Sequence, residues 1–364
     1  MSEHVRAALA TVVDGGTLTM DQARVTMAAV MDGEATPAQL AALLVALRMR
    51  GETIEELAGF ASAMRERVLH VDAPEGTIDT CGTGGDRSGT FNISTAAALV
   101  VAAAGVPVAK HGNRAITSQS GSADVLEALG VRTDHDPVSA ATALRERGFA
   151  FLFATGFHPA MRHAGPTRRE IGVRTAFNLL GPITNPAGAR RQVVGVGDAV
   201  AAPRIAEVLR LLGVDRALVV HGDGVDELPL DGSGVLYDVT PDGVERRTIV
   251  ARSMGLGAAP LSKLAGGDAA TNGRLLEAVL RGESGARRDV VLLNAGAAFL
   301  AAGRAPTIDA GIELAALTID SGLAAELLDA LRTEKRVADA AAQARAEAAA
   351  AAASGEPAAE GTPA

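Results

Sequence analysis

The chain has 364 residues, of which 48% are hydrophobic and 2% aromatic, and it carries a formal net charge of −9. This length allows one large or two moderate domains, and the hydrophobic content is ample for a core. The acidic balance and the lack of Trp argue against a nucleic-acid surface, because such surfaces need clustered Lys and Arg and often aromatic stacking platforms. The composition agrees with a metabolic enzyme.

Three features bear on where the chain resides. The start Met1-Ser2-Glu3-His4 has an early acid and no apolar h-region, so no secretory signal is visible. The apolar run 96–109 is shorter than the ~18 residues of a membrane span and contains Gly-Val-Pro. The single cysteine, Cys81, cannot form an internal disulfide. We therefore expect a cytoplasmic protein that does not bind membranes.

The first seventy or so residues are predicted to be helical. Thr36-Pro37 is a good N-cap followed by an N1 proline, and Thr53-Ile54-Glu55-Glu56 is a capping box. The helix after this box has its apolar residues on one stripe, which consists of Leu57, Phe60, Ala61 and Met64. Residues 1–70 are therefore predicted to form a small helical domain.

The pattern changes near Ile78 to short apolar strands that alternate with helices. The predicted strands are 77–79, 106–109, 149–154, 193–196, 217–220 and 290–293. Among the predicted helices is 202–212, closed by Gly213. Such alternation is typical of a largely parallel sheet covered by helices. The predicted fold class is therefore α/β: a small N-terminal helical domain and a larger α/β domain, residues 71–335, with a mostly parallel central sheet flanked by helices.

Residues 336–364 differ from the rest of the chain. Residues 337–353 are rich in Ala with scattered Arg and Glu, and 354–363 are of low complexity. We expect a fraying helix followed by a disordered tail.

The most informative stretch of the chain runs from Asp79 to Gly130. The strand at 77–79 opens into Gly82-Thr83-Gly84-Gly85-Asp86. Glycines let the backbone take positive φ and bring its N–H groups close to an anion, and helix N-termini after such loops bind phosphate well. Asp86 is a carboxylate inside this loop, so we infer that a metal ion or sugar hydroxyls arrive with the phosphate.

Two commoner glycine-loop classes do not fit these residues. A dinucleotide fingerprint that starts at Gly82 would need its third glycine where Arg87 stands, and no suitably placed acid follows. A Walker loop that starts at Gly84 reaches its second glycine at Gly89, but Thr90-Phe91 follows instead of Lys-Ser/Thr. A lone Gly-Thr-Gly-Gly is more often an ordinary turn, but three further motifs within one βαβ-sized stretch favour a functional site.

Motifs along nearly the whole chain, up to about Arg332, resemble those of the anthranilate phosphoribosyltransferase family of tryptophan biosynthesis. Besides the glycine loop, these motifs are Asn92-Ile93-Ser94-Thr95, Lys110-His111-Gly112-Asn113-Arg114, 120–127, 157–161, 174–182, Asn185-Pro186 and 221–227. Their number and order make the resemblance specific. It implies a two-domain enzyme whose helical domain takes in an excursion near 165–185, with the active site in the cleft between domains and a homodimer formed through the helical domains.

The resemblance implies transfer of the 5-phosphoribosyl group from phosphoribosyl pyrophosphate to the amine of anthranilate. Charge develops on the ribose and on the leaving group, so magnesium and donors around pyrophosphate matter more than a strong base. The implied residues for phosphoribosyl pyrophosphate are Gly82, Thr83, Gly84, Gly85, Asp86, Thr90, Asn92, Ser94, Thr95, Lys110 and Ser122. Two Mg²⁺ ions are implied, one bound by Ser94 and Glu227 and the second by Asp226 with Glu227, because hard oxygen ligands suit this ion.

Anthranilate is a planar aromatic carboxylate, so its site is expected to combine a flat surface with one guanidinium. The residues that the resemblance implies for it are Gly82, His111, Gly112, Asn113, His158 and Arg168. Arg169 is an open alternative to Arg168, and the cations around them could also form a solvated face. Lys110 would stabilise the transition state together with magnesium. His111 is an open candidate for a base that the reaction does not require, since the neutral aniline nitrogen can lose its proton after attack.

Several alternatives remain open at this point. Cys81 beside the glycine loop is either a nucleophile or, as we expect, a small buried side chain. Gln119 stands where Lys is often expected and Arg162-His163 replaces a Lys or aromatic pair, which bears on anthranilate affinity and the shape of the site's mouth. A pyrimidine nucleoside phosphorylase shares the fold, although Lys110-His111-Gly112-Asn113-Arg114 argues against it. A nucleic-acid-binding relative without enzyme activity would need a basic surface.

Overall fold

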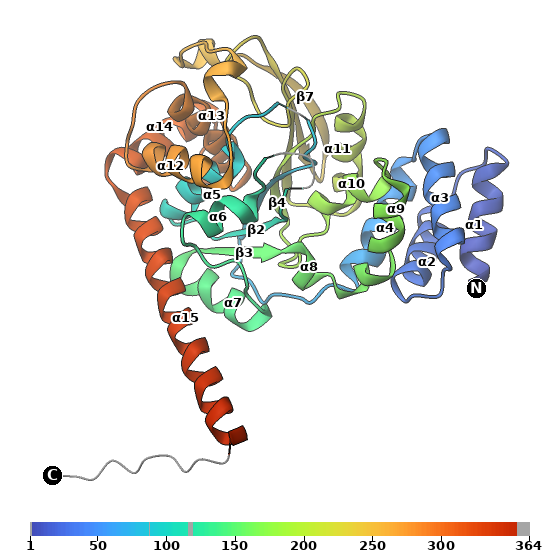
Figure 1. Cartoon of the computed structure of the whole chain (residues 1–364). Coiled ribbons are helices and arrows are strands. Elements are labelled where there is room, and N and C mark those ends of the chain that lie inside the picture. The colour runs from blue at the N-terminus through green and yellow to red at the C-terminus, as the bar shows by residue number, and fades with distance from the viewer. Residues whose placement is uncertain (1, 87, 116–118, 355–364) are drawn as a thin grey trace.

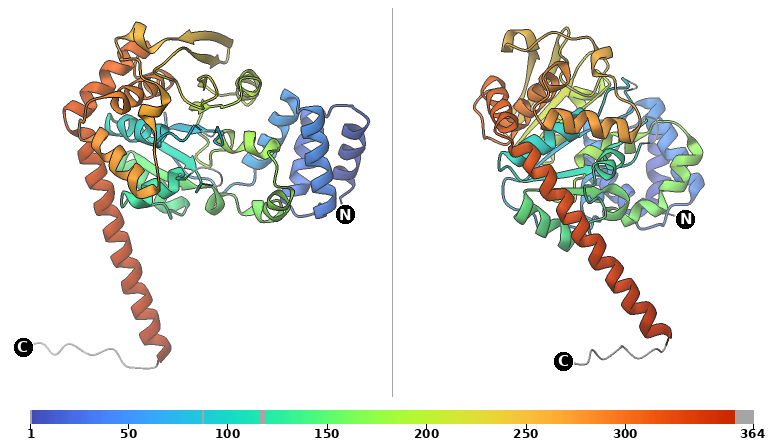
Figure 2. Two further views of the ribbon diagram at one scale, coloured as in Figure 1. Left: turned by 45° about the horizontal axis from the view of Figure 1, so that its top comes forward. Right: turned by 60° about the vertical axis from the view of Figure 1, so that its left-hand side comes forward.

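The computed structural model describes residues 2–86, 88–115 and 119–354. It contains a helical unit that includes the N-terminal segment and an α/β unit built on one sheet (Figure 1). The views in Figure 2 show the N-terminal helices at one end of the molecule and the sheet with its covering helices at the other. This arrangement confirms the predicted fold class.

The N-terminal helices begin where the sequence places their caps. They are α1 (Glu3–Val13), α2 (Met20–Met31), α3 (Pro37–Arg50) and α4 (Ile54–Arg65). The Thr36 hydroxyl accepts a hydrogen bond from the backbone N–H of Gln39, and the Thr53 hydroxyl accepts one from the N–H of Glu56. The apolar stripe predicted for α4 is buried. Two later helices, α9 (Gly165–Ile171) and α10 (Ala176–Leu180), pack against α3 and α4 and so extend the helical unit.

The sheet has seven strands in the order β3-β2-β1-β4-β5-β6-β7. Their bounds are β1 (Ile78–Gly82), β2 (Val108–Gly112), β3 (Phe149–Phe153), β4 (Arg191–Gly195), β5 (Arg216–His221), β6 (Gly234–Thr240) and β7 (Gly243–Ile249). Strands β1 to β5 are parallel, and β6 and β7 add an antiparallel edge. Since β1 pairs with both β2 and β4, the order of the strands reverses at β1. Ligands of open α/β sheets bind at the carboxyl ends of the strands beside such a switch point.

Helices cover both faces of this sheet. The longer ones are α5 (Ile93–Ala103), α7 (Pro137–Arg147), α11 (Ala201–Leu211), α12 (Ala269–Leu280), α13 (Ala286–Ala301) and α14 (Ile308–Asp320); the short ones include α6 (Ser122–Ala128), α8 (Ala154–Phe157), η1 (Pro159–His163), η2 (Gly181–Ile183), η3 (Ala251–Met254) and η4 (Leu261–Leu264). Alternate strand residues face opposite cores, as Val193 and Val194 of β4 show. The core that contains Val194 also contains α11 and the N-terminal helices, so the helical unit is packed against one face of the sheet.

The prediction of a strand at 290–293 is wrong. These residues lie inside α13, where every residue from Val290 to Ala301 is buried. A helix that is buried all round has no polar face, so a short apolar run within it cannot be distinguished from a buried strand by periodicity. The other predicted strands lie at β1 to β5, and the helix predicted at 202–212 is α11. The edge strands β6 and β7 were not predicted.

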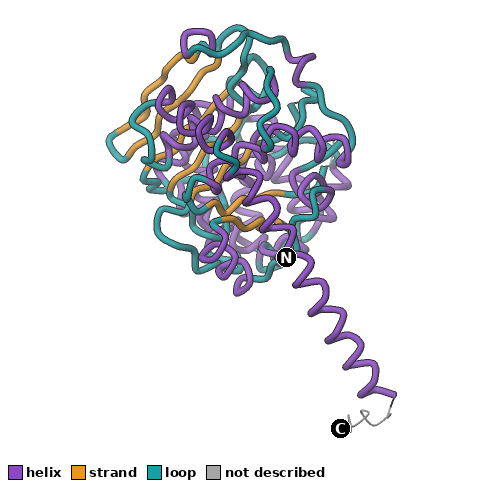
Figure 3. Tube along the Cα trace, turned by 90° about the vertical axis from the view of Figure 1, so that its left-hand side faces the viewer, coloured by secondary structure: helices purple, strands orange, loops and turns teal. Residues whose placement is uncertain are grey.

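The last helix, α15 (Leu323–Ser354), begins on the body of the protein and then projects away from it (Figures 1 and 3). Leu328 and Leu331 are buried, whereas the side chains of residues 339–350 are exposed. The predicted alanine-rich helix is confirmed, and the disordered tail predicted beyond it lies at 355–364, outside the described residues. In the part of the chain that the structure describes, no helix has the length and apolar character needed to span a bilayer.

Truncation after Ala338 is expected to leave the melting temperature and the rate of the protein nearly unchanged. The described side chains that are removed, those of residues 339–350, are exposed and bury too little surface to contribute to stability. Thermal unfolding and steady-state kinetics check this expectation. Truncation after Leu327 is the matched control, because it also removes Leu328, Leu331 and the Arg332–Glu277 ion pair of 2.7 Å. Loss of two buried leucines is expected to destabilise the protein by roughly 4 kcal/mol or more. Equal melting temperatures for the two truncations would contradict this reading of α15.

Candidate active site

The carboxyl ends of β1 and β4 meet at the switch point, and both strands end in glycine. Gly82 is in register with Gly195, and the segment that carries Asp226 lies over both. A Cβ atom at Gly195 would overlap the Asp226 carbonyl, and one at Gly82 would overlap the Asp226 carboxylate. Both strands therefore need glycine here, because the backbone of Asp226 lies against Gly195 and its side chain lies against Gly82.

Three carboxylates converge on this point. The Asp226 carboxylate accepts a hydrogen bond of 2.9 Å from the Gly84 N–H, and the Asp226 N–H donates to the Asp86 carboxylate over 3.4 Å. The Glu227 carboxylate accepts a hydrogen bond of 3.1 Å from the Ser94 N–H. Burial raises the pKa of Asp226 to about 6, and the Asp86 carboxylate adds to this shift. Burial, and next the charge of Asp226, raise the pKa of Glu227 well above its ordinary value.

These carboxylates fit a divalent cation that arrives with phosphate. A cation would offset the burial and the repulsion that raise the pKa values of Asp226 and Glu227. Within residues 2–86, 88–115 and 119–354, no group of three His, Cys, Asp or Glu side chains could hold a metal ion by itself. Magnesium at phosphate sites usually takes only one or two carboxylates and completes its shell with phosphate oxygens and water. The carboxylates of Asp86, Asp226 and Glu227 suit a magnesium ion that is also bound by phosphate oxygens.

Lys110 is the buried cation of the site. Its side chain is only 2% exposed, and its Nζ donates to the Thr80 carbonyl at 2.5 Å and to the Ser94 hydroxyl at 3.4 Å. Burial lowers the pKa of Lys110, while the nearby Asp79 carboxylate opposes this shift. Its burial shows that Lys110 is not a solvated surface charge. Lys110 and Ser94 thus lie together at the switch point, although 16 residues separate them in the sequence.

The glycine loop is held from two sides. Gly84 and Gly85 have φ of +61° and +68°, which is the conformation that glycine makes accessible. The Thr83 N–H donates to the Gly195 carbonyl over 2.8 Å. The Arg174 guanidinium donates to the carbonyls of Gly84 and Gly85, each over 3.2 Å. Arg174 was not predicted as a site residue, and it ties the segment before α10 to the loop.

Residues 88–92, which follow the loop, form hydrogen bonds with one another and with later segments of the chain. Thr90 pairs with Ala265 as a β-bridge, and its hydroxyl lies 3.1 Å from the Ser88 hydroxyl. The Asn92 side chain accepts from the Asn272 amide over 3.0 Å and donates to the Ser120 carbonyl over 3.2 Å. Asn272 is buried on α12 and was missed, because a lone Asn in a helix gives no signal in the sequence.

One buried donor of this region is without a partner. The Thr95 hydroxyl lies in the first turn of α5, and it has no hydrogen-bond partner among the described residues. A buried hydroxyl without a partner is costly, and an arriving phosphate oxygen would satisfy it. A small cavity of about 10 Å³ also lies here, lined in part by Thr80, Ser94, Glu227 and Asn294.

Hydrogen bonds to Asp124 hold the described residues between β2 and α6. The Asp124 carboxylate accepts hydrogen bonds of 2.9 Å from the N–H groups of Ala115 and Gly121. The Ser122 hydroxyl donates to the Asn113 carbonyl over 3.4 Å, close beside Gly112. Ser122, Gly112 and Asn113 therefore lie together.

His111 is fixed at three of its atoms. Its N–H donates to the buried Asp79 carboxylate over 3.2 Å, Nδ1 lies 3.1 Å from the Gly181 carbonyl, and Nε2 lies 3.2 Å from Nε2 of His158. The Asn185 amide donates to Asp79 over 2.7 Å and to the Ala109 carbonyl over 2.8 Å. Burial raises the pKa of Asp79 to about 6. Asp79 was not predicted to act here, and Asn185 was noted only as part of a motif.

Arg168 differs from Arg169 in its surroundings. Its guanidinium carbon lies 4.7 Å from the centre of the Phe177 ring, and burial lowers the pKa of Arg168. Neither an ion pair nor a hydrogen bond engages this guanidinium in the portion of the chain that is described. Arg169 is exposed. A half-buried guanidinium without an anionic partner is the better candidate for binding a carboxylate, although no contact joins Arg168 to His111 or His158 in the described residues.

Cys81 is a small buried side chain, as expected. Its thiol lies 3.5 Å from the Pro182 carbonyl, and burial raises the pKa of Cys81 well above its ordinary value. A nucleophilic cysteine needs the opposite shift, because the thiolate is the reactive form. The structure therefore disfavours the alternative that Cys81 is a nucleophile.

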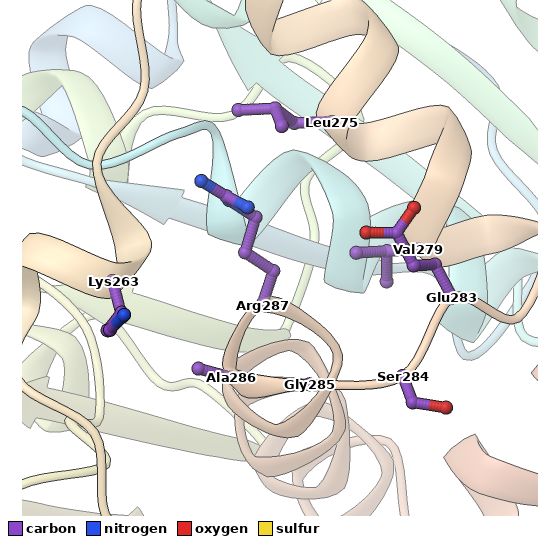
Figure 4. Close-up of a pocket in the computed structure, with 8 residues that line it drawn as sticks. All are labelled: Lys263, Leu275, Val279, Glu283, Ser284, Gly285, Ala286 and Arg287. Atoms are coloured by element: carbon purple, nitrogen blue, oxygen red, sulfur yellow. The ribbon is translucent and has the colours of Figure 1, made fainter.

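A second cavity, of about 170 Å³, lies away from the switch point at the beginning of α13. Figure 4 shows Lys263, Glu283, Ser284 and Arg287 around it. None of the predicted site residues lines it. The cavity is therefore not part of the candidate active site.

Comparisons with known proteins identify the family to which the chain belongs. Residues 74–325 match the profile described as "Glycosyl transferase family, a/b domain", and residues 6–68 match "Glycosyl transferase family, helical bundle domain". The chain is similar to anthranilate phosphoribosyltransferases of Xanthobacter autotrophicus and Chloroflexus aggregans. The first is 50% identical over 92% of this chain and 98% of the relative, and the second is 53% identical over 89% and 96%.

Solved structures show the same fold. A crystal structure of anthranilate phosphoribosyltransferase from Thermus thermophilus has a TM-score of 0.86 at 46% identity and covers 90% of this chain and 99% of its own. The enzyme from Saccharomyces cerevisiae, in complex with PRPP and Mg, has a TM-score of 0.84 at 26% identity and covers 92% and 99%. With its helical bundle, its α/β domain and these near full-length relatives, the chain belongs to the anthranilate phosphoribosyltransferase family.

Proposed function

We propose that this chain transfers the 5-phosphoribosyl group from phosphoribosyl pyrophosphate to the amine of anthranilate, giving N-(5-phosphoribosyl)anthranilate and pyrophosphate in tryptophan biosynthesis. The observation that carries the proposal is the meeting of Ser94, Lys110 and Glu227 beside a glycine loop at the switch point of the sheet. The yeast relative binds PRPP and Mg in its crystal structure, which supports the same pair of ligands here.

Phosphoribosyl pyrophosphate is proposed to bind at the carboxyl ends of β1 and β2. The Gly85 N–H of the glycine loop, the Lys110 ammonium and the Thr95 hydroxyl, which has no partner among the described residues, are proposed as donors for its phosphate oxygens. The proposed binding residues are Gly82, Thr83, Gly84, Gly85, Asp86, Thr90, Asn92, Ser94, Thr95, Lys110 and Ser122. A buried, fixed ammonium stabilises negative charge on the leaving group more strongly than one in water.

Two magnesium ions are proposed for this site, held by Ser94 with Glu227 and by Asp226 with Glu227. Asp226 and Glu227 follow one another in the sequence and contact the loop and α5 respectively. When bound, magnesium neutralises part of the pyrophosphate charge as the ribose–oxygen bond breaks.

Anthranilate is proposed to bind against Gly82, His111, Gly112, Asn113, His158 and Arg168. Burial lowers the pKa of His111 to about 3 and that of His158 to about 4, so both rings are neutral near pH 7. The two neutral rings, tilted by 36° to one another, are proposed to line the site of the aromatic ring, and Arg168 is proposed to pair with the carboxylate. The amine nitrogen then forms a bond with C1 of the ribose while the bond to pyrophosphate breaks, and the extra proton on nitrogen leaves to solvent.

The domain organisation follows the same proposal. Residues 1–70 with the excursion at 165–185 form the helical domain, residues 71–335 form the catalytic domain, and residues 336–364 form a C-terminal tail.

We infer a homodimer through the helical domain, since Val13 at the end of α1 and Val45 and Met49 on α3 are exposed apolar side chains. Helices α1 and α3 are neighbours, so these side chains belong to one part of the surface. Cytoplasmic residence stays a prediction.

One assay tests the proposal directly. Addition of phosphoribosyl pyrophosphate and magnesium to the protein and anthranilate is expected to remove anthranilate fluorescence, and excess chelator is expected to abolish the loss because the carboxylates must bind phosphates through a cation. Full turnover in chelator would overturn the magnesium assignment. Phosphorolysis of thymidine or uridine without any turnover of anthranilate would instead favour a nucleoside phosphorylase.

A further inference from the structure

The Arg174 guanidinium holds two consecutive carbonyls of the glycine loop. Its Nη1 atom donates to the Gly84 carbonyl and to the Gly85 carbonyl, each over 3.2 Å. A guanidinium Nη atom carries two hydrogens, so one atom can serve both oxygens. Because both oxygens bond to the same atom, they face the same side of the loop. The φ of +61° at Gly84 and of +68° at Gly85 makes this arrangement accessible.

The direction of these carbonyls also sets the direction of two N–H groups. In a planar trans peptide the N–H points opposite to the C=O, and the described residues contain no cis peptide bond. The N–H groups of Gly85 and Asp86 therefore point away from Arg174. Neither of them donates to a protein acceptor within residues 2–86, 88–115 and 119–354. Neighbouring N–H groups that point to one side form a concavity that binds anions.

The backbone of Arg174 is fixed independently of its side chain. Arg174 precedes Thr175, the N-cap of α10, whose N–H donates to the Asn178 side chain over 3.0 Å. The next two residues, Ala176 and Phe177, are buried, and α10 packs against α3 and α4. The side chain thus reaches from the helical unit to the sheet. Among the described contacts, no other side chain donates to the two loop carbonyls.

We propose that Arg174 is a positioning residue of the phosphoribosyl pyrophosphate site, which holds the carbonyls of Gly84 and Gly85 so that the N–H groups of Gly85 and Asp86 face the phosphate oxygens. This inference rests on the proposed function, because it assigns the glycine loop to that substrate. Arg174 acts through the loop and does not contact the substrate. Holding the two peptide groups before the ligand arrives lowers the cost of ordering them on binding.

Two variants of Arg174 test the hydrogen bonds by steady-state kinetics. Arg174→Met keeps an unbranched side chain without a donor, whereas Arg174→Lys retains an ammonium that can donate to a carbonyl. We expect the KM for phosphoribosyl pyrophosphate to rise roughly 5- to 30-fold in Arg174→Met and to stay within about threefold of the parent in Arg174→Lys. The anthranilate KM is expected to change little in either. Equal increases in the two variants would overturn the role of the hydrogen bonds.

A second test observes the loop itself. Relaxation of ¹⁵N in glycine-labelled protein reports the ps–ns motion of the Gly84 and Gly85 amides. We expect their order parameters to fall in Arg174→Met and to keep the parent's values in Arg174→Lys. A raised KM for phosphoribosyl pyrophosphate with unchanged order parameters would show that Arg174 binds the substrate directly, and this result would overturn the positioning role.

Arg210→Met is the matched control. Arg210 is an exposed arginine of α11 that pairs with Glu207 of the same helix over 2.8 Å, outside the site. Its substitution is expected to leave both KM values and the motion of the loop unchanged.

Calorimetry with pyrophosphate and magnesium, without anthranilate, separates this inference from the proposed function. Weaker pyrophosphate binding by Arg174→Met than by Arg210→Met would support the positioning role, and equal binding would overturn it. A parent protein that consumed no anthranilate would overturn the proposed function, whereas the calorimetric comparison would still decide the role of Arg174.

Discussion

Replacement of Arg168 by Ala is expected to raise the anthranilate KM by roughly one to three powers of ten. The substitution removes the proposed partner of the substrate carboxylate, and loss of a charge-assisted contact in a partly dry pocket costs roughly 2 to 4 kcal/mol. The half-buried guanidinium lies over the Phe177 ring and forms no ion pair with the described residues. No carboxylate of the protein therefore competes with the substrate carboxylate for it. Steady-state kinetics with each substrate varied in turn measure the effect.

Two variants serve as controls for Arg168→Ala. Arg169→Ala removes an exposed guanidinium from the adjacent position and is expected to change the anthranilate KM only slightly. Lys110→Ala is expected to show the reverse pattern, with the larger change in the KM for phosphoribosyl pyrophosphate, because Lys110 contacts Ser94 and Thr80, and Thr80 lies on the strand that leads into the glycine loop. If Arg168→Ala weakened both substrates equally, or neither, Arg168 would be a structural charge and Arg169 the next candidate.

Replacement of Glu227 by Gln is expected to nearly abolish turnover at ordinary magnesium concentrations. Glu227 is the proposed ligand of both ions, and the neutral amide cannot supply the negative charge that compensates them. The loss is expected to exceed the roughly 10- to 100-fold that follows removal of a partner outside the ligand shell. The magnesium concentration for half-maximal activity should rise, and added magnesium should restore part of the rate. Magnesium binding measured by calorimetry in the presence of pyrophosphate gives a readout that does not depend on turnover.

Asp223→Asn is the matched control for Glu227→Gln. Asp223 is an exposed acid of the same connection, and its φ of 41° is a conformation that Asn tolerates well. Its substitution is expected to leave the magnesium dependence unchanged. An equal loss in both variants would show that the connection responds to any change of charge, and Glu227 would then not be assigned as a ligand.

The local elements of the fold could be predicted because their signals lie within a few neighbouring residues. The hydroxyls of Thr36 and Thr53 cap their helices as their sequence spacing indicates. The prediction failed at 290–293, where a helix is buried on every side, and at β7, where Glu245, Arg246 and Arg247 are exposed on an edge strand and give no apolar alternation. Because 290–293 was predicted as a strand, Asn294 on α13 was also missed. Its side chain hydrogen-bonds to the backbone N–H and carbonyl of Leu228, the residue after Glu227.

The sequence by itself determined the fold class, the helix caps, the glycine loop and the family, because each depends on short spacings or on motifs in a fixed order. Only the tertiary structure decided which of these residues meet. Ser94 and Glu227 are 133 residues apart, Arg174 and Gly84 are 90 apart, and Asp79 and Asn185 are 106 apart. Contacts of this kind depend on the reversal of strand order at β1 and on the packing of the helical unit against the sheet, and no local pattern encodes either.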